Sequence, residues 1–271
     1  MTDNAARRAA RDYQAANPGT SYTRALRQVM QDRRRPLSAT LGVGLDSNPV
    51  TLILEWETPG GAGPHCLITG PSKSDSSAVV ATLARGLHSG QRRGDLELVV
   101  TGSDDLDIDV AHRFISAAEF PSFVEDLLKV RAALFRSLDN PAIFNIEDAR
   151  AADHRISTIV LIIDSPTAPI HDALQTLLRV GRSYGINVVL AAHTEPAPTV
   201  HVDVEPREML RRRLLDRAYL RGEIEEMFTS VIFALGDGRA TLRTPGVRRG
   251  VRESLAPADD LCDFMISAQK S

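Results

Sequence analysis

The pattern of hydrophobic and polar residues changes near position 37. From there on, short runs of consecutive Val, Ile and Leu alternate with longer stretches in which apolar residues recur every three or four positions. Continuous aliphatic runs are typical of strands buried on both faces of a sheet. We therefore predict strands at residues 50–56, 65–69, 96–100, 158–163, 187–191 and 230–234.

The stretches between these runs predict helices. Their apolar residues fall on one face at helical spacing, as in helices that cover a sheet. The predicted helices span residues 77–88, 120–138, 170–184 and 206–220. Near the end of the chain, Gly236-Asp237-Gly238-Arg239 predicts a turn, and residues 240–243 predict a hairpin strand. The alternation of strands and helices favours an α/β fold with a mainly parallel sheet flanked by helices.

The first 36 residues predict a separate helical extension. Residues 5–16 and 21–32 have helical spacing and are separated by Asn17-Pro18-Gly19. The segment contains eight arginines and three aspartates. Such a basic segment can contact DNA or an acidic partner, or it can be a solvated linker. We predict an N-terminal extension over residues 1–36 and one α/β domain over residues 37–271.

Composition narrows the class of protein. The chain has 271 residues, 43% hydrophobic residues and a formal net charge of -3, which suits a protein with a buried core rather than a general nucleic-acid binder. The longest aliphatic run, at 159–163, is far shorter than the roughly 20 residues of a membrane span, and residues 1–4 do not begin a signal peptide. Cys66 and Cys262 lack the spacing of a metal site or a disulfide framework. We expect a cytoplasmic protein without membrane insertion.

A candidate phosphate-binding loop follows the strand predicted at residues 65–69. Strand, loop and helix in this order are the context of a P-loop, whose pattern is G-x-x-x-x-G-K-[ST]. The pattern aligns with the segment Gly70, Pro71, Ser72, Lys73, Ser74, Asp75, Ser76 and Ser77, and a helix is expected from Ser77. Only the first glycine and the last serine match, because Asp75 replaces the second glycine and Ser76 replaces the lysine.

These two replacements act against triphosphate binding. The P-loop lysine neutralises the β- and γ-phosphates, and bare backbone near the glycine lets them approach the amides. Asp75 adds a like charge instead, which costs on the order of 4 kcal/mol at ~4 Å and an effective dielectric constant near 20. Alternatively, Asp75, Ser74 or Ser76 caps the helix and replaces the phosphate at its N-terminus. Lys73 either substitutes for the lost ammonium group or points to solvent.

Asp164 directly follows the strand predicted at residues 158–163. This is the form of a Walker B strand, whose aspartate helps to hold Mg²⁺, although an aspartate there can also be a helix cap or a loop anchor. Ser165 and Pro166 follow, where an active ATPase of this class has a glutamate that polarises water. Serine is not a general base near neutral pH without an activating partner. We therefore expect weak binding of ATP and Mg²⁺ at most.

The wider chain resembles the ATPase domain of the FtsK/SpoIIIE family, in particular the EccC-like ATPase domains of actinobacterial type VII secretion motors. The similarity covers about residues 37–252, and its specificity lies in the order of the segments. These segments are Leu41-Gly42-Val43-Gly44-Leu45 with Asn48-Pro49-Val50, residues 60–65, residues 123–135 with 145–148, and residues 178–191. In the family the last segment usually ends in a Thr-Gln or Ser-Gln sensor, whereas here Ala192-His193-Thr194 follows.

The resemblance implies a RecA-like P-loop fold and a tendency to form rings. By the same resemblance, His193 and Thr194 take the place of the sensor, with a purely structural histidine as the alternative. Arg211 is a candidate arginine finger toward a neighbouring subunit, and Arg239 and Arg243 are candidate contacts to nucleic-acid phosphate. The alternative for these arginines is a solvated surface.

Three hypotheses remain open. Complete members of the family hydrolyse ATP to pump DNA or to drive protein export, and degenerate copies serve as binding or regulatory modules. The first hypothesis is a non-hydrolysing or weakly nucleotide-binding module whose partner is an FtsK/SpoIIIE-type motor, a secretion component or DNA, with a homo-oligomer also open. The second is an active ATP-dependent DNA translocase that uses Lys73 and Asp164. The third is DNA binding through the basic N-terminal helices without nucleotide.

Overall fold

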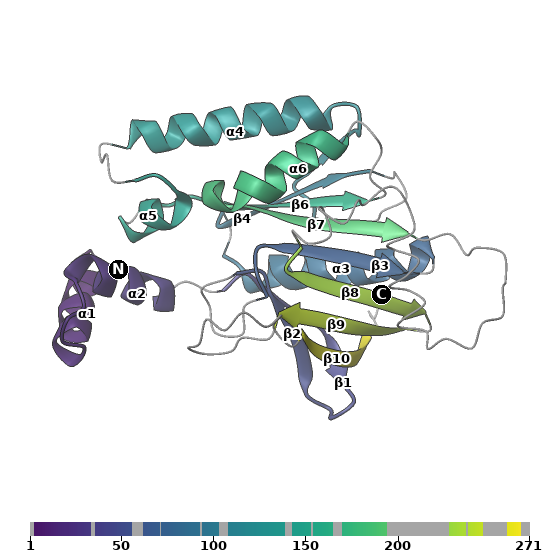
Figure 1. The fold of residues 1–271 in the computed structure, drawn as a ribbon, viewed down its shortest axis with the longest axis horizontal. Coiled ribbons are helices and arrows are strands. Elements are labelled where there is room, and N and C mark those ends of the chain that lie inside the picture. The colour runs from purple at the N-terminus through teal and green to yellow at the C-terminus, as the bar shows by residue number, and fades with distance from the viewer. Residues whose placement is uncertain are drawn as a thin grey trace.

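The structure is a computed structural model, and one large sheet forms its centre (Figure 1). It describes residues 3–33, 36–55, 62–70, 72–92, 94–102, 108–138, 143–152, 154–164, 170–193, 228–236, 238–245 and 259–266. The strands are β1 (Ser38–Gly44), β2 (Pro49–Ile53), β3 (His65–Gly70), β4 (Leu96–Thr101), β5 (Arg113–Ile115), β6 (Thr158–Asp164), β7 (Ile186–His193), β8 (Ser230–Gly236), β9 (Arg239–Pro245) and β10 (Asp259–Ile266).

The ten described strands form one mixed sheet in the order β2-β1-β10-β9-β8-β3-β7-β6-β4-β5. From β8 to β5 all neighbouring strands are parallel. From β8 back to β2 all neighbours are antiparallel. The predicted α/β fold with a mainly parallel sheet is confirmed, and the antiparallel strands extend it on one side.

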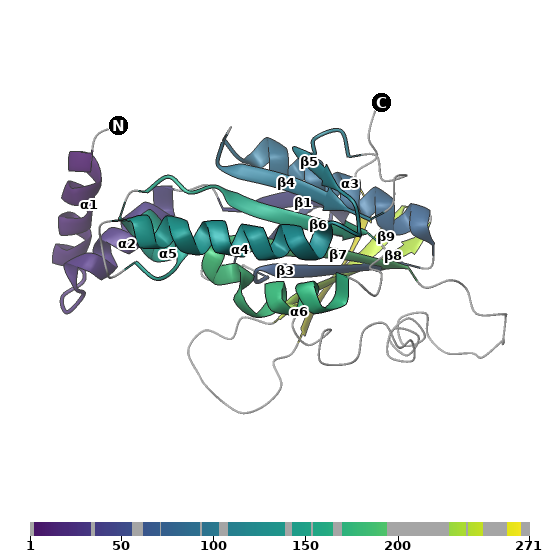
Figure 2. The same cartoon turned by 90° about the horizontal axis from the view of Figure 1, so that it is seen from above.

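Helices cover both faces of the parallel half, as Figure 2 shows. The helices are α1 (Asp3–Ala16), α2 (Tyr22–Arg33), α3 (Lys73–Gly90), α4 (Phe120–Ser137), α5 (Ile146–Ala151) and α6 (Ile170–Val180), and α6 continues into a 3-10 turn (Gly181–Tyr184). α3 packs on one face, where Val80, Leu83 and Leu87 meet Cys66 and Ile68 of β3 in one core cluster. α4 and α6 pack on the other face.

β3 explains why aliphatic runs mark these strands. All six of its residues are buried, and it pairs in parallel with β7 on one side and β8 on the other. Alternate residues serve opposite clusters: Ile68 belongs to the α3 cluster and Leu67 to the α4/α6 cluster. Because both faces are covered, the residues of such a strand are mainly apolar.

Each strand predicted from the sequence is present, with small shifts at its ends. The helix predicted at residues 170–184 ends as an α-helix at Val180 and finishes as a 3-10 turn, which Gly185 closes with a φ of 72°. β1, β5 and β10 are not among the strands predicted from the hydrophobic pattern, and the helix predicted at residues 206–220 lies outside the described residues. None of the helices in the described ranges is long and apolar enough to cross a membrane.

The two N-terminal helices form a hairpin with a small core of its own. Ala10, Ala25 and Val29 are buried between α1 and α2, and Tyr13 and Leu26 pack against them. In Figure 1 the hairpin lies beside α5, away from the sheet, and α2 contacts α5. The two predicted N-terminal helices are therefore confirmed, with the turn at Gly19, whose φ is 91°.

His65, the first residue of β3, is buried with 2% of its surface exposed. Its Nδ1 accepts a hydrogen bond from the backbone N–H of Val188 at 3.1 Å, which ties β3 to β7. Burial is the largest of the effects that lower the pKa of His65, to about 4 from its usual 6.5. The imidazole is therefore neutral in the folded protein near neutral pH.

This burial predicts a specific pH dependence of stability. Between pH 6.5 and about 4 the unfolded chain binds a proton at His65 that the folded chain does not, so the free energy of unfolding falls as the pH falls. The full effect is about 3 kcal/mol. In His65→Asn the amide oxygen can still accept from Val188, but the group does not titrate. Urea unfolding of both proteins at pH 7 and pH 4.5 should show a smaller loss in the variant. An equal loss in both proteins would contradict this assignment.

Candidate functional site

The carboxyl ends of β3, β7 and β6 meet at one edge of the sheet. Gly70 pairs with His193, and Asp164 pairs with Ala191 on the other side of β7. Since β7 separates β3 from β6, Gly70 and Asp164 lie two strand spacings apart, on the order of 10 Å. Ligands of open α/β sheets bind at this end of the strands. The structure therefore brings the predicted phosphate-loop glycine, the sensor position and the predicted Mg²⁺ ligand to one edge.

The connection from β3 to α3 is much shorter than a phosphate-binding loop. β3 ends at Gly70 and α3 begins at Lys73, so residues 71 and 72 alone connect them. The prediction that the loop continues to Ser76 and the helix begins at Ser77 was wrong, because residues 73–77 form the first turn and a half of α3. Pro71 lies outside the described residues.

Ser72 closes the N-terminus of α3 together with Asp75. Ser72 has extended backbone dihedrals, and its Oγ accepts from the Asp75 N–H at 3.2 Å. The same hydroxyl donates to Asp75 Oδ2 at 2.5 Å and lies 2.9 Å from the Ser74 hydroxyl. This is a variant of the capping box, in which the N3 carboxylate returns to the cap residue. The side chains of the first turn thus satisfy the positive end of the helix dipole, a function that a bound phosphate has in a P-loop.

Ser76, at the position of the P-loop lysine, is directed into the helix. It is fully buried, and its hydroxyl lies 3.3 Å from the carbonyl oxygen of Ser72 and 3.1 Å from that of Lys73. A side chain added at Gly70 would meet Ala234 Cβ at 3.1 Å and Asp75 Cβ at 3.6 Å. Asp75 therefore lies directly over the end of β3, where an approaching phosphate would meet its carboxylate.

Asp164 is fully buried at the end of β6. The residue after β4 packs against the backbone of Asp164: Gly102 has a φ of 125°, and a Cβ at this position would lie only 2.0 Å from the Asp164 carbonyl oxygen. Mg²⁺ usually keeps several water ligands, so a carboxylate without exposure to solvent fits it poorly. Among the described residues there is also no group of three or more His, Cys, Asp or Glu side chains that would hold a metal ion.

The remaining predicted site residues are spread along the sheet. His193 ends β7, whereas Thr194 and Arg211 lie outside the described residues. Arg239 begins β9 opposite Gly236, at the same edge as Gly70 but two strands away. Arg243 pairs with Val231 and Leu261, further along β9. The structure thus places Arg239, but not Arg243, near the edge that carries Gly70.

Comparison with solved structures identifies the architecture. The chain is similar to the cytoplasmic domain of the type VII secretion ATPase EccC from Thermomonospora curvata, with 18% sequence identity and a TM-score of 0.59, over 86% of this chain and 29% of that chain. It is also similar to ATPases 2 and 3 of the same protein in complex with a signal sequence peptide, with 16% identity and a TM-score of 0.56, over 88% and 42% of the two chains.

A third similar structure comes from a different bacterium. This structure, ATPases 2 and 3 of EssC from Geobacillus thermodenitrificans, has 11% identity and a TM-score of 0.58, over 88% of this chain and 46% of that chain. No family model matches the chain, and no curated protein sequence does. The chain spans less than half the length of each of these structures. It therefore has the fold of FtsK/SpoIIIE-type P-loop ATPase domains.

The hydrogen bonds between Ser72 and Asp75 predict that Ser72, the N-cap of α3, stabilises the protein. Ser72→Ala removes both the acceptor for the Asp75 N–H and the donor to its carboxylate, so we expect a loss of about 1 kcal/mol in the free energy of unfolding. Ser77→Ala is the matched control, because it makes the same change inside the helix, where alanine is the better helix former. Urea denaturation measures both. Equal effects at the two positions would contradict the role of Ser72.

Proposed function

We propose that this chain is a degenerate FtsK/SpoIIIE-like module that does not hydrolyse ATP and that binds or regulates a motor, secretion or DNA-handling assembly. The proposal depends on the short connection between β3 and α3 and on the hydrogen bonds at the start of α3. The connection is two residues long, and Ser72 and Asp75 occupy the helix N-terminus that a triphosphate would need. The residues at this corner do not fit a bound nucleotide in the described arrangement.

The chemistry of the residues present supports the same conclusion. A triphosphate needs compensating positive charge, and the carboxylate of Asp75 supplies the opposite sign. Lys73 is the first residue of α3, three positions before the lysine of the aligned P-loop pattern. Ser165 follows Asp164 in the sequence, so the position of the catalytic glutamate has no general base. Binding of the nucleotide and activation of water are thus both disfavoured.

The partner that we propose is a component of a secretion or DNA-translocation motor, or a second copy of this chain. The fold similarity to the cytoplasmic ATPase domains of EccC and EssC supports a secretion motor. One of the similar structures holds EccC with a signal sequence peptide, which supports a peptide segment as the element that is recognised. A module that keeps the motor fold but has lost the phosphate site retains its surfaces for such contacts.

The N-terminal hairpin supports a second candidate function, the binding of DNA without nucleotide. Arg7, Arg8, Arg11 and Arg24 are exposed on α1 and α2. The hairpin lies at one end of the molecule in Figure 1, where a duplex can reach it. Arginines on such a surface neutralise phosphates irrespective of base sequence.

Nucleotide binding tests the first proposal directly. With a fluorescent ATP analogue and Mg²⁺ we expect no submicromolar binding, and in a phosphate-release assay no turnover with or without double-stranded DNA. Submicromolar binding together with turnover would overturn the proposal. Phosphate release that DNA stimulates and that Lys73→Ala abolishes would instead identify an active translocase.

The salt dependence of DNA binding tests the second candidate. If the hairpin contacts phosphates, changing Arg7, Arg8 and Arg11 together to Gln should weaken binding and reduce the slope of log K against log salt by about 1 for each lost contact. The matched control changes Arg136, Arg155 and Arg179, which are exposed outside the hairpin, to Gln. An equal reduction in both variants, or no binding by the native chain, would exclude the hairpin as the DNA site.

A further inference from the structure

The sheet ends in an open strand, β5. β5 is the last strand in the order and pairs with β4 alone among the described strands. His112, directly before β5, donates its backbone N–H to Leu98 of β4. Alternate residues of a strand direct their peptide groups to the same side, so Arg113 and Ile115 direct theirs away from β4. Peptide groups that a sheet edge leaves unpaired can form hydrogen bonds with the main chain of an added strand.

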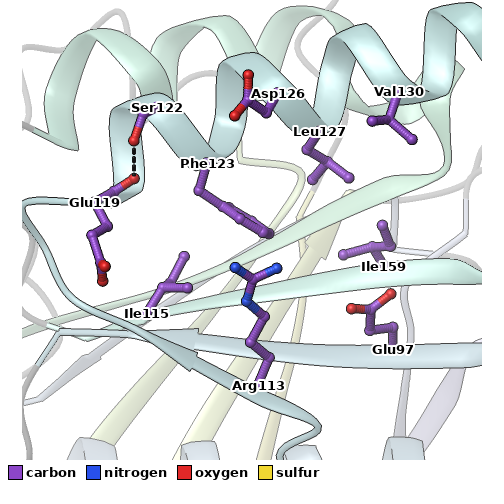
Figure 3. A pocket seen from close by; sticks show the side chains of 10 residues that line it. All are labelled: Glu97, Arg113, Ile115, Glu119, Ser122, Phe123, Asp126, Leu127, Val130 and Ile159. Atoms are coloured by element: carbon purple, nitrogen blue, oxygen red, sulfur yellow. Dashed lines mark hydrogen bonds between the residues drawn. The ribbon is translucent and has the colours of Figure 1, made fainter.

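A groove of about 430 Å³ lies beside this edge, between α4 and strands β4, β5 and β6 (Figure 3). Its apolar lining includes Phe123 and Leu127 of α4 and Ile159 of β6. The guanidinium carbon of Arg113 lies 4.8 Å from the centroid of the Phe123 ring, over its face. Grooves of this size, with an apolar lining and a few polar groups, bind ligands in many proteins.

The charges of the groove are predominantly negative. Glu97, Glu119 and Asp126 line it together with one base, Arg113. Hydrogen bonds from Ser116 to the Glu119 carboxylate, and to a smaller extent the charge of Arg113, lower the pKa of Glu119, which therefore stays ionised at neutral pH. Three carboxylates and one guanidinium line the groove, and Lys129, 3.9 Å from Asp126, offsets part of this negative charge. This lining, beside an apolar surface, is complementary to a basic side chain with an aliphatic stem.

We propose that β5 and this groove form a docking site for an extended, basic segment of a partner protein, which adds to the sheet as a further strand. The inference deepens the proposed function and rests on it, because it assigns the surface by which the module binds its partner. The peptide groups of Arg113 and Ile115 pair with the main chain of the segment. Alternate Lys or Arg side chains lie along Phe123 and Leu127 and reach toward Glu97 and Asp126.

The other side of β5 suits the remaining side chains of such a segment. Phe114 lies between Arg113 and Ile115, so its side chain is on the opposite face of the strand, and 62% of it is exposed. In a bound strand with apolar residues on one face and basic residues on the other, the apolar residues therefore contact Phe114, and the basic residues lie in the groove. A helix cannot use the open peptide groups of β5, which favours an extended segment.

Fluorescence anisotropy with the full chain tests this site. The probe is a labelled heptapeptide of alternating Val and Lys, and the comparison peptides replace Lys by Glu or carry a methyl group on every peptide nitrogen. We expect the lysine peptide to bind, and the glutamate and N-methylated peptides to bind at least about 10-fold more weakly. The first comparison tests the charge of the groove, and the second tests strand pairing.

Two charge reversals on α4 locate the site. Asp126→Lys should weaken the binding of the lysine peptide about 10-fold, whereas Glu125→Lys should change it less than about 2-fold. Both residues are exposed neighbours that contact Lys129, but Asp126 lines the groove and Glu125 does not. Thermal unfolding confirms that both variants are folded.

Several results would overturn the assignment. These are the absence of binding by the lysine peptide, equal binding of the N-methylated or glutamate peptide, and equal weakening by the two reversals, which would indicate general attraction to an acidic protein. None of them bears on nucleotide binding. A failure of the groove is therefore distinguishable from a failure of the proposed function, which ATP turnover would reveal.

Discussion

The burial of β3 between two parallel neighbours is the constraint on which the rest of the structure depends. Because β7 and β8 pair with both of its edges and helices cover both of its faces, β3 has no freedom to shift. Its carboxyl end is therefore held in place, and α3 begins three residues after it. The residues that follow β3 then determine what the connection to α3 can bind. Here Ser72 and Asp75 satisfy the N-terminus of α3 through their own hydrogen bonds.

The sequence predicted the parallel strands β8, β3, β7, β6 and β4 because they are rich in aliphatic residues, as in the run from Ile159 to Ile163. The hydrophobic pattern did not predict β5 or β10, and the physical reason differs between the two strands. β5 has three residues, too few to show a period, and β10 carries three aspartates among its apolar residues because long-range pairing with β9 stabilises it. No local pattern encodes a partner that is distant along the chain.

The sequence predicted the corner between β3 and α3, but not the residue at which α3 begins. The order of strand, Gly70 and helix located the corner, and Asp164 was correctly placed at the end of its strand. The start of α3 was predicted four residues too late, because Ser72 and Asp75 were aligned with a degenerate phosphate-binding loop. Their S-x-x-D spacing is also a signal for the start of a helix. The groove beside β5 left no signal in the sequence, since its residues come from four separate elements.

The N-terminal hairpin has a consequence for how the molecule responds to stress. Its core consists of two alanines and one valine, and it is joined to the rest of the protein through α5. So small a buried area gives little resistance to local opening compared with the clusters on either side of the sheet. The amide hydrogens of α1 and α2 should thus exchange through fluctuations that leave the sheet intact, and heating should release the hairpin as a separate cooperative unit before the sheet unfolds.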